Sequence, residues 1–125
     1  MSRRVAVVGV GQTKYAAKRQ DVSMPGLVRE AAKRALDDAG MTWSDIDAVV
    51  IGKAPDMFEG VMMPELFLAD ALGATGKPMM RVHTAGSVGG STAIAASQTP
   101  LRVALALLLP CDREDPFVDV RLDEV

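Results

Sequence analysis

One serine of this chain lies in a context that favours acyl chemistry. Ser87 follows an apolar, strand-like stretch that breaks at Ala85-Gly86, and a helix of small residues is predicted to begin directly after it. A helix start presents backbone N–H groups that lack intrahelical partners, and such groups stabilise an oxygen that gains negative charge. The segment therefore predicts a hydroxyl and several donors at one point, as acyl chemistry requires.

A serine attacks a carbonyl only when a base accepts its proton. The one histidine, His83, precedes Ser87 by four residues on the incoming strand. A triad histidine normally comes from a distant loop, so no hydrolase triad is predicted, although residues 85–89 resemble a nucleophile elbow. On the residues alone, Ser87 is equally well explained as a helix cap and as a catalytic residue. His83 is either a hydrogen-bonded structural residue or an accessory catalyst.

Two further motifs favour structural explanations. Gly9-Val-Gly11 follows an apolar run, but Lys14 stands where a dinucleotide fingerprint needs its third glycine, and no helix opens there. A tight turn at the end of a strand is the better interpretation. Cys111 has no partner residues at a spacing that could ligate a metal, so no metal site is predicted.

A methionine-rich connection follows residue 52. It contains Met57, Phe58, Met62 and Met63. Methionine adapts to irregular apolar surfaces, so these side chains could line an apolar pocket or a subunit contact. Packing in the protein core is the favoured alternative.

The elements that must position Ser87 alternate between strand and helix. Residues 23–39 have one apolar face, a serine that can cap the helix start and Gly40 as the stop. The expected order is strand 4–10, helix 23–39, strand 48–51, helix 64–72, strand 79–83 and helix 87–97. This order predicts an α/β fold with a parallel βαβαβα core. The last helix carries no charge and is expected to be buried on several sides.

Composition limits the class of protein. The 125 residues carry a net charge of −2 and only 4% aromatic residues, which argues against nucleic-acid binding. A single cysteine cannot form an internal disulfide, so the cytoplasm is the expected location. The longest apolar run, 103–109, is too short to span a membrane.

The composition changes near residue 98. All eleven glycines lie before residue 91, and no lysine follows Lys77. We therefore divide the chain into a domain at 1–97 and a divergent tail at 98–125, whose last ten residues are expected to be poorly ordered. Within the tail, residues 101–109 could form either a strand or a short helix.

Four segments together resemble the amino-terminal part of the thiolase superfamily, and most closely its sterol-carrier or nonspecific lipid-transfer type. They agree with that family in order and spacing, and the similarity covers residues 4–97. The segments are 5–14, 45–52, 62–66 and 82–93.

The resemblance implies chemistry on acyl-CoA thioesters in lipid or sterol metabolism. In such thiolases the third strand leads to an Asn-x-x-Cys segment whose cysteine attacks the thioester. Thr84 and Ser87 stand at those two positions here. A serine hydroxyl ionises far less readily than a cysteine thiol, whose pKa is about 8.5. The expected reaction is therefore acyl transfer or a carbon–carbon cleavage, such as the retro-aldol cleavage of a 3-hydroxyacyl-CoA. The backbone of Val88 and Gly89 would help to hold the thioester.

The resemblance also implies what surrounds this site. Coenzyme A enters as a substrate thioester and not as a bound cofactor, and family members pair as homodimers or hetero-oligomers. The second half of a thiolase, with its catalytic histidine and second cysteine, has no counterpart in this sequence. We therefore expect little or no turnover from this chain alone, and an aberrant, truncated ending after residue 97.

Two other classes of function stay open. One is a noncatalytic lipid or acyl-CoA binding module, or a subunit of a larger complex. The other is a small serine hydrolase built on Ser87, against which the absence of a downstream histidine argues.

Overall fold

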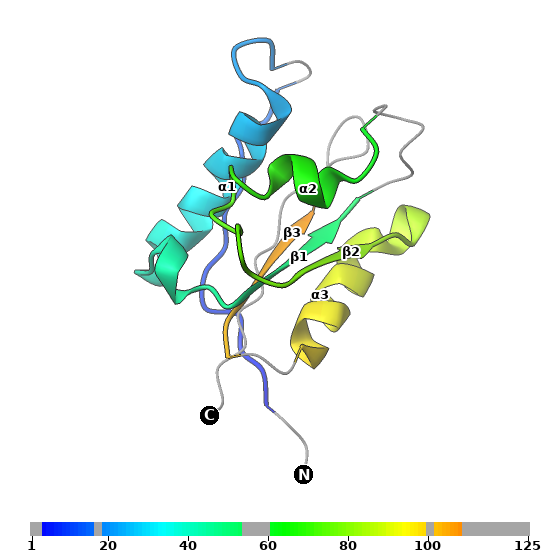
Figure 1. Ribbon diagram of the computed structural model, residues 1–125. Coiled ribbons are helices and arrows are strands. Elements are labelled where there is room, and N and C mark those ends of the chain that lie inside the picture. The colour runs from blue at the N-terminus through cyan, green and yellow to red at the C-terminus, as the bar shows by residue number, and fades with distance from the viewer. Residues whose placement is uncertain (1–3, 17–18, 54–60, 100–101, 109–125) are drawn as a thin grey trace.

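The computed structural model describes residues 4–16, 19–53, 61–99 and 102–108. Its core is a parallel sheet with helices on both faces (Figure 1). The elements are α1 (Met24–Ala39), a 3-10 turn (Trp43–Asp45), β1 (Ala48–Gly52), α2 (Pro64–Leu68), β2 (Met79–Val82), a second 3-10 turn (Ala85–Ser87), α3 (Val88–Gln98) and β3 (Ala104–Leu108). No helix in these segments is long and apolar enough to cross a lipid bilayer.

The sheet has the order β2-β1-β3, and both pairs are parallel. Its side chains alternate between two faces, as strand geometry requires. Val49, Ile51 and Leu105 pack with residues of α1 and α2, whereas Val50 and two alanines of β3 pack with Ala96 of α3. The result is a three-layer molecule with α1 and α2 on one face and α3 on the other (Figure 1).

Helix α1 follows its sequence signals closely. The amide of Gly26 donates to the Ser23 hydroxyl at the start, and Gly40 ends the helix with a left-handed φ of 66°. The buried residues lie on the predicted apolar face: Val28, Ala31, Ala32, Ala35 and Leu36. The expected helix at 64–72 is shorter, because regular helix ends at Leu68 and turns follow.

The prediction of a strand at residues 4–10 is wrong. Both edges of β1 are occupied, one by β2 and the other by β3, so no place beside the central strand remains for this segment. It runs along α1 instead. Gly9 and Gly11 lie against the helix backbone: a Cβ on Gly11 would come within 2.3 Å of the Ala31 carbonyl oxygen. The structure shows no turn at these glycines, so close approach, and not a tight turn, explains them.

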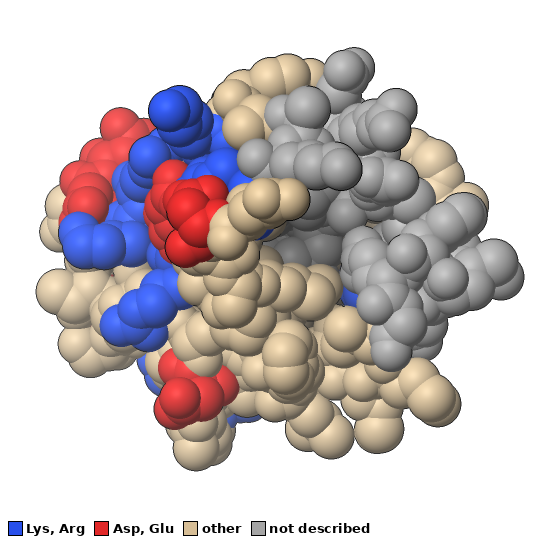
Figure 2. Space-filling model, turned by 90° about the horizontal axis from the view of Figure 1, so that it is seen from above, with Lys and Arg blue, Asp and Glu red and all other residues tan. Residues whose placement is uncertain are grey.

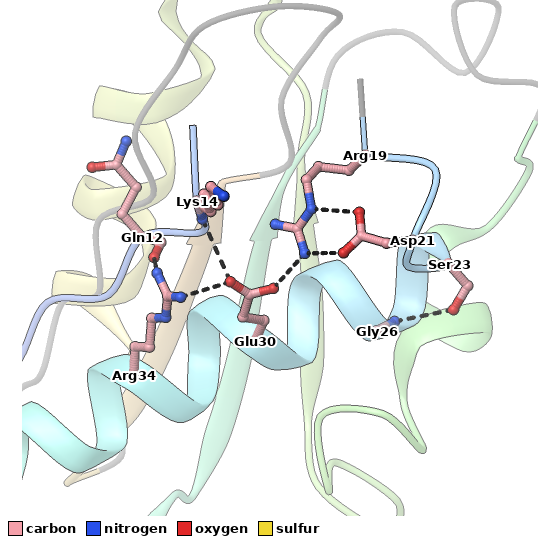
Figure 3. Close-up of polar contacts among 8 residues, drawn as sticks. All are labelled: Gln12, Lys14, Arg19, Asp21, Ser23, Gly26, Glu30 and Arg34. Carbon is pink, nitrogen blue, oxygen red and sulfur yellow. Dashed lines mark hydrogen bonds and ion pairs between the residues drawn. The ribbon is translucent and has the colours of Figure 1, made fainter. Parts of the chain in front are cut away.

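Charged side chains of α1 replace the strand partners that this segment lacks. The Val10 amide donates to Asp38 at 2.9 Å, and the Lys14 amide donates to Glu30 at 3.4 Å. Arg34 donates to the carbonyl oxygen of Gln12 (Figure 3). Backbone polar groups outside a sheet still need partners, and here a helix surface supplies them.

Arg19 closes the same network at its far end (Figure 3). Its guanidinium donates two hydrogen bonds to Asp21, at 2.9 and 3.0 Å, and one to Glu30 at 2.9 Å. These contacts raise the pKa of Arg19, with Asp21 as the larger cause, and lower the pKa values of both carboxyl groups. Glu30 also forms an ion pair with Arg34 of α1 at 2.8 Å. Its carboxylate therefore contacts the amino-terminal segment at two points, Lys14 and Arg19, and one residue of its own helix.

The segment after residue 97 contributes to the core. Residues 104–108, which the sequence leaves open between strand and helix, form β3, and Leu105 is fully buried. The last ten residues, expected to be poorly ordered, lie outside the described part of the chain. Helix α3 is less enclosed than predicted: only Thr92 and Ala96 are buried, and Ile94 is 59% exposed. Its alanines fit against the small side chains of one sheet face, which leaves the opposite side of the helix uncovered.

Candidate functional site

Ser87 lies at the start of α3, beyond the carboxyl end of β2 (Figure 1). Its side chain is exposed, and the 3-10 turn Ala85–Ser87 connects the strand to the helix. Ala85 has a φ of 48°, a left-handed conformation that is unfavourable for a residue with a side chain. Such strain is typically kept where a structure must hold a particular geometry. Ser87 itself has an ordinary φ of −96°, unlike the nucleophile of a strained elbow.

Hydrogen bonds within this turn occupy two of the groups that the sequence predicts to act on a substrate, the Ser87 hydroxyl and the Val88 amide. The Ser87 hydroxyl donates to the Thr84 carbonyl oxygen at 3.0 Å, and it does not cap the helix. The Val88 amide donates to the carbonyl oxygen of Ala85, so it is not available to a substrate oxygen in this conformation. Of the two backbone groups that the sequence suggests, this leaves Gly89 as the candidate donor.

His83 lies beside the turn with an exposed side chain. Within the described residues, no hydrogen bond joins it to Ser87, so these two residues do not form a nucleophile–base pair. A serine hydrolase mechanism therefore lacks its second member here. The roles of Ser87 and His83 in catalysis stay predictions.

An exposed apolar surface lies at the same end of the sheet. Met62 is 80% exposed, Met63 53%, Leu66 67% and Phe67 52%. The favoured expectation that the methionine-rich connection packs in the core is thus wrong for Met62 and Met63. The reason is local: Pro64 and Leu68 form the buried side of the short helix α2, so Leu66 and Phe67 between them, and Met62 and Met63 before them, face outward. Met57 and Phe58 lie outside the described residues, as does Cys111.

Charged residues mark a part of this site that the sequence does not reveal. Glu65 of α2 lies 3.7 Å from the guanidinium Nε of Arg81 in β2, and both side chains are partly buried. Lys53, directly after β1, is fully buried. These residues are 12 to 28 positions apart. The period of two places Ile51 and Lys53 on one sheet face, but Arg81 joins that face only through the sheet register, which the sequence does not show.

The surface at this end has an uneven distribution of charge. Seen from above, charged side chains gather mainly on one side, whereas much of the remaining described surface is uncharged (Figure 2). Among the described residues, no group of three histidine, cysteine or carboxylate side chains is arranged to hold a metal ion.

Comparison with known proteins identifies related sequences. No protein-family model matches the chain. Sterol carrier protein 2 of Gallus gallus is 35% identical over 107 residues, which cover 85% of this chain and 19% of that protein. Acetyl-CoA acetyltransferase of Methanothermobacter thermautotrophicus is 37% identical over 92 residues, covering 70% of this chain and 23% of that enzyme. The chain thus spans about a fifth of the length of the curated relatives that it matches.

Solved structures share the fold. The 3-oxoacyl-[acyl-carrier-protein] synthase III of Aquifex aeolicus superimposes with a TM-score of 0.73 at 12% identity, over 98% of this chain and 54% of that one. An Ltp2-ChsH2(DUF35) aldolase superimposes with a TM-score of 0.65 at 24% identity, over 89% of this chain and 28% of that one. The predicted α/β fold class is confirmed, although one of its expected strands is replaced by β3.

Proposed function

Because the chain belongs to the thiolase superfamily, we propose that it binds acyl-CoA thioesters with the thioester carbonyl at the start of α3. The observation that carries this proposal is the exposed Ser87 at the junction of β2 and α3, next to the strained Ala85. A partly unsatisfied helix start offers donors to a carbonyl oxygen without adding a charge. Gly89 would provide one such donor, and the Ser87 hydroxyl a second after it leaves Thr84.

The apolar surface of α2 supports an acyl chain as the remainder of the ligand. Met62, Met63, Leu66 and Phe67 are exposed, and α2 begins at the same end of the sheet as α3 (Figure 1). When such side chains cover the apolar surface of a ligand, the complex is stabilised by roughly 25 cal/mol for each Å² removed from water. This surface suits a long acyl or sterol-derived chain better than an acetyl group.

The chemistry proposed for this site is carbon–carbon bond cleavage or acyl transfer without a cysteine nucleophile. In a retro-aldol cleavage, a base removes the proton of the 3-hydroxyl, the bond between C2 and C3 breaks, and a carbonyl forms at C3. The electron pair passes to the thioester as an enolate, which donors near Ser87 would stabilise before C2 is protonated. The aldolase among the structural neighbours makes this the favoured reaction class.

Calorimetric titration with a long-chain acyl-CoA, with coenzyme A and with the free fatty acid tests the proposal. We expect the thioester to bind most tightly. Ser87→Phe, which fills the start of α3, should weaken thioester binding about tenfold or more, whereas Ser97→Ala at the far end of the same helix should not. No binding of the thioester, or equal affinity in Ser87→Phe, would overturn the proposal.

A noncatalytic lipid-binding role is the second candidate, and the exposed apolar residues of α2 favour it. It predicts that the free fatty acid binds as tightly as the thioester and that Ser87→Phe has no effect. The same titrations therefore separate the two functions.

A further inference from the structure

Thr84 connects the strand before the candidate site to the helix after it. Its hydroxyl donates to the Ser91 Oγ atom at 2.9 Å, and Ser91 lies one turn into α3. The Thr84 carbonyl oxygen accepts twice from Ser87, from the amide at 3.2 Å and from the hydroxyl at 3.0 Å. Thr84, two positions after the end of β2, therefore makes three hydrogen bonds to Ser87 and α3.

These hydrogen bonds enclose the strained part of the turn. Ala85, with its left-handed φ of 48°, lies between Thr84 and Ser87. Thr84 itself has a φ of −132° and a ψ of 35°, outside the regular helix and strand regions. Strain of this kind persists only where the surrounding structure fixes the segment at several points. The bond to Ser91 fixes one side of Ala85, and the bond from the Ser87 amide fixes the other.

The three bonds differ in what a ligand can change. The Ser87 hydroxyl can turn about its side-chain torsion and donate to a thioester oxygen, whereas the Ser87 amide and the Thr84 hydroxyl need not move. The two bonds that stay keep the turn in place while the Ser87 hydroxyl changes partner. A donor whose surroundings are fixed beforehand loses less entropy on binding. The side chains of Thr84 and Ser87 are exposed, so a ligand can reach this point.

We propose that Thr84 is a positioning residue for the acyl-CoA thioester, because its bond to Ser91 holds the turn that presents the Ser87 hydroxyl. This inference rests on the proposed function and adds the residue that keeps Ser87 in place. Thr84 acts through Ser87, and its own hydroxyl stays on Ser91 when the thioester binds. Water can replace the lost partner of an exposed hydroxyl, so this bond should affect thioester binding more than folding.

A double-mutant cycle on Thr84 and Ser91 tests the inference, with hexadecanoyl-CoA binding measured by calorimetric titration. Thr84→Val keeps the shape of the side chain without its hydroxyl, and it should weaken binding about threefold to tenfold. Ser91→Ala removes the acceptor and should weaken binding by a similar factor. The double variant should bind no more weakly than either single variant, because all three lack the same hydrogen bond. Thr84→Ser keeps the hydroxyl and should bind as the unaltered chain does.

Two controls separate positioning from a purely structural role. Ser97→Ala removes a hydroxyl that donates to the Ile94 carbonyl oxygen at 2.7 Å near the far end of α3, and it should leave thioester binding unchanged. The midpoint of urea unfolding should change little in Thr84→Val and Ser91→Ala, which shows that the weaker binding does not come from unfolding.

The outcomes separate the two proposals. Unchanged affinity of Thr84→Val for hexadecanoyl-CoA, or single effects that multiply in the double variant, would overturn the role of Thr84 and leave the proposed function standing. If Thr84→Val does not fold, Ser91→Ala decides the question, because it breaks the same bond from the side of α3. Failure of the unaltered chain to bind hexadecanoyl-CoA would overturn the proposed function itself.

Discussion

Replacing Gly11 with alanine should release the amino-terminal segment from α1. The added Cβ would lie 2.3 Å from the Ala31 carbonyl oxygen and 2.4 Å from the Ala35 amide nitrogen. Both atoms belong to the helix backbone and cannot rotate away, so the segment itself must move. Such a displacement would break the hydrogen bonds from the Val10 and Lys14 amides to Asp38 and Glu30.

The size of the effect follows from two opposing contributions. Overpacking of this kind costs about 1–3 kcal/mol, whereas the loss of glycine freedom in the unfolded chain returns about 0.4–1 kcal/mol. We expect the free energy of unfolding to fall by about 1–2 kcal/mol. Gly90→Ala is the matched control, because its Cβ would meet nothing within 4 Å inside α3. That change should raise the free energy of unfolding by about 0.5–1 kcal/mol.

Urea titration followed by circular dichroism measures both variants, and hydrogen exchange reports on the segment directly. In Gly11→Ala the amides of Val10 and Lys14 should exchange faster, while those of β1 keep their relative protection. If Gly11→Ala is as stable as the unaltered chain and these two amides stay protected, the close packing of this segment on α1 does not exist in solution.

Three further predictions test the packing of the fold. Leu105→Ala should lower the free energy of unfolding by about 2–5 kcal/mol, because Leu105 is fully buried. Leu66→Ala, at an exposed position, should change it by less than about 0.5 kcal/mol. Similar values for both variants in urea titration would mean that β3 is not part of the core. Gly40→Ala should lower the free energy of unfolding by about 1 kcal/mol through backbone strain alone, because the φ of Gly40 is 66° and no atom lies within 4 Å of its Cβ position. An unchanged melting temperature would contradict the role of Gly40 as the C-cap. The hydrogen bond from Arg19 holds the pKa of Glu30 below its ordinary value of 4.5, so its stabilisation is complete above that pH and is lost as the pH falls through the lowered value. Glu30→Gln should therefore be less stable than the unaltered chain at neutral pH, with a gap that closes in acid, and a gap independent of pH would refute the role of this carboxylate.

Local signals predicted the parts of the fold that depend on local chemistry. Helix α1 has a serine cap, one apolar face and a terminal glycine, and each of these acts within a few residues. The start of α3 is predicted by an equally local signal, the end of the apolar stretch at Ala85-Gly86. These features place Ser87 at a helix start without any knowledge of tertiary contacts.

The errors arose where distant segments compete for one partner. Residues 4–10 have the composition of a strand, but both edges of β1 are occupied. One of them is taken by β3, which lies more than 90 positions further along the chain than residues 4–10. The same holds for the site. The Glu65–Arg81 ion pair joins residues 16 positions apart, and only the sheet register brings them together. The Val88 amide is unavailable to a substrate because it is hydrogen-bonded within a 3-10 turn, and composition does not indicate that turn.

The arrangement of strands has a consequence for how the chain folds. Every pair in the sheet is parallel, and the central strand bonds to partners that lie about 30 and 56 positions further along the chain. No hairpin is available to begin sheet formation within the described residues, so long loops must close before any ladder stabilises the molecule. Folding rates fall as such separations grow. Acquisition of the native state should thus be slow for a protein of this size, and α1, whose backbone hydrogen bonds and caps are local, should gain structure before the sheet does.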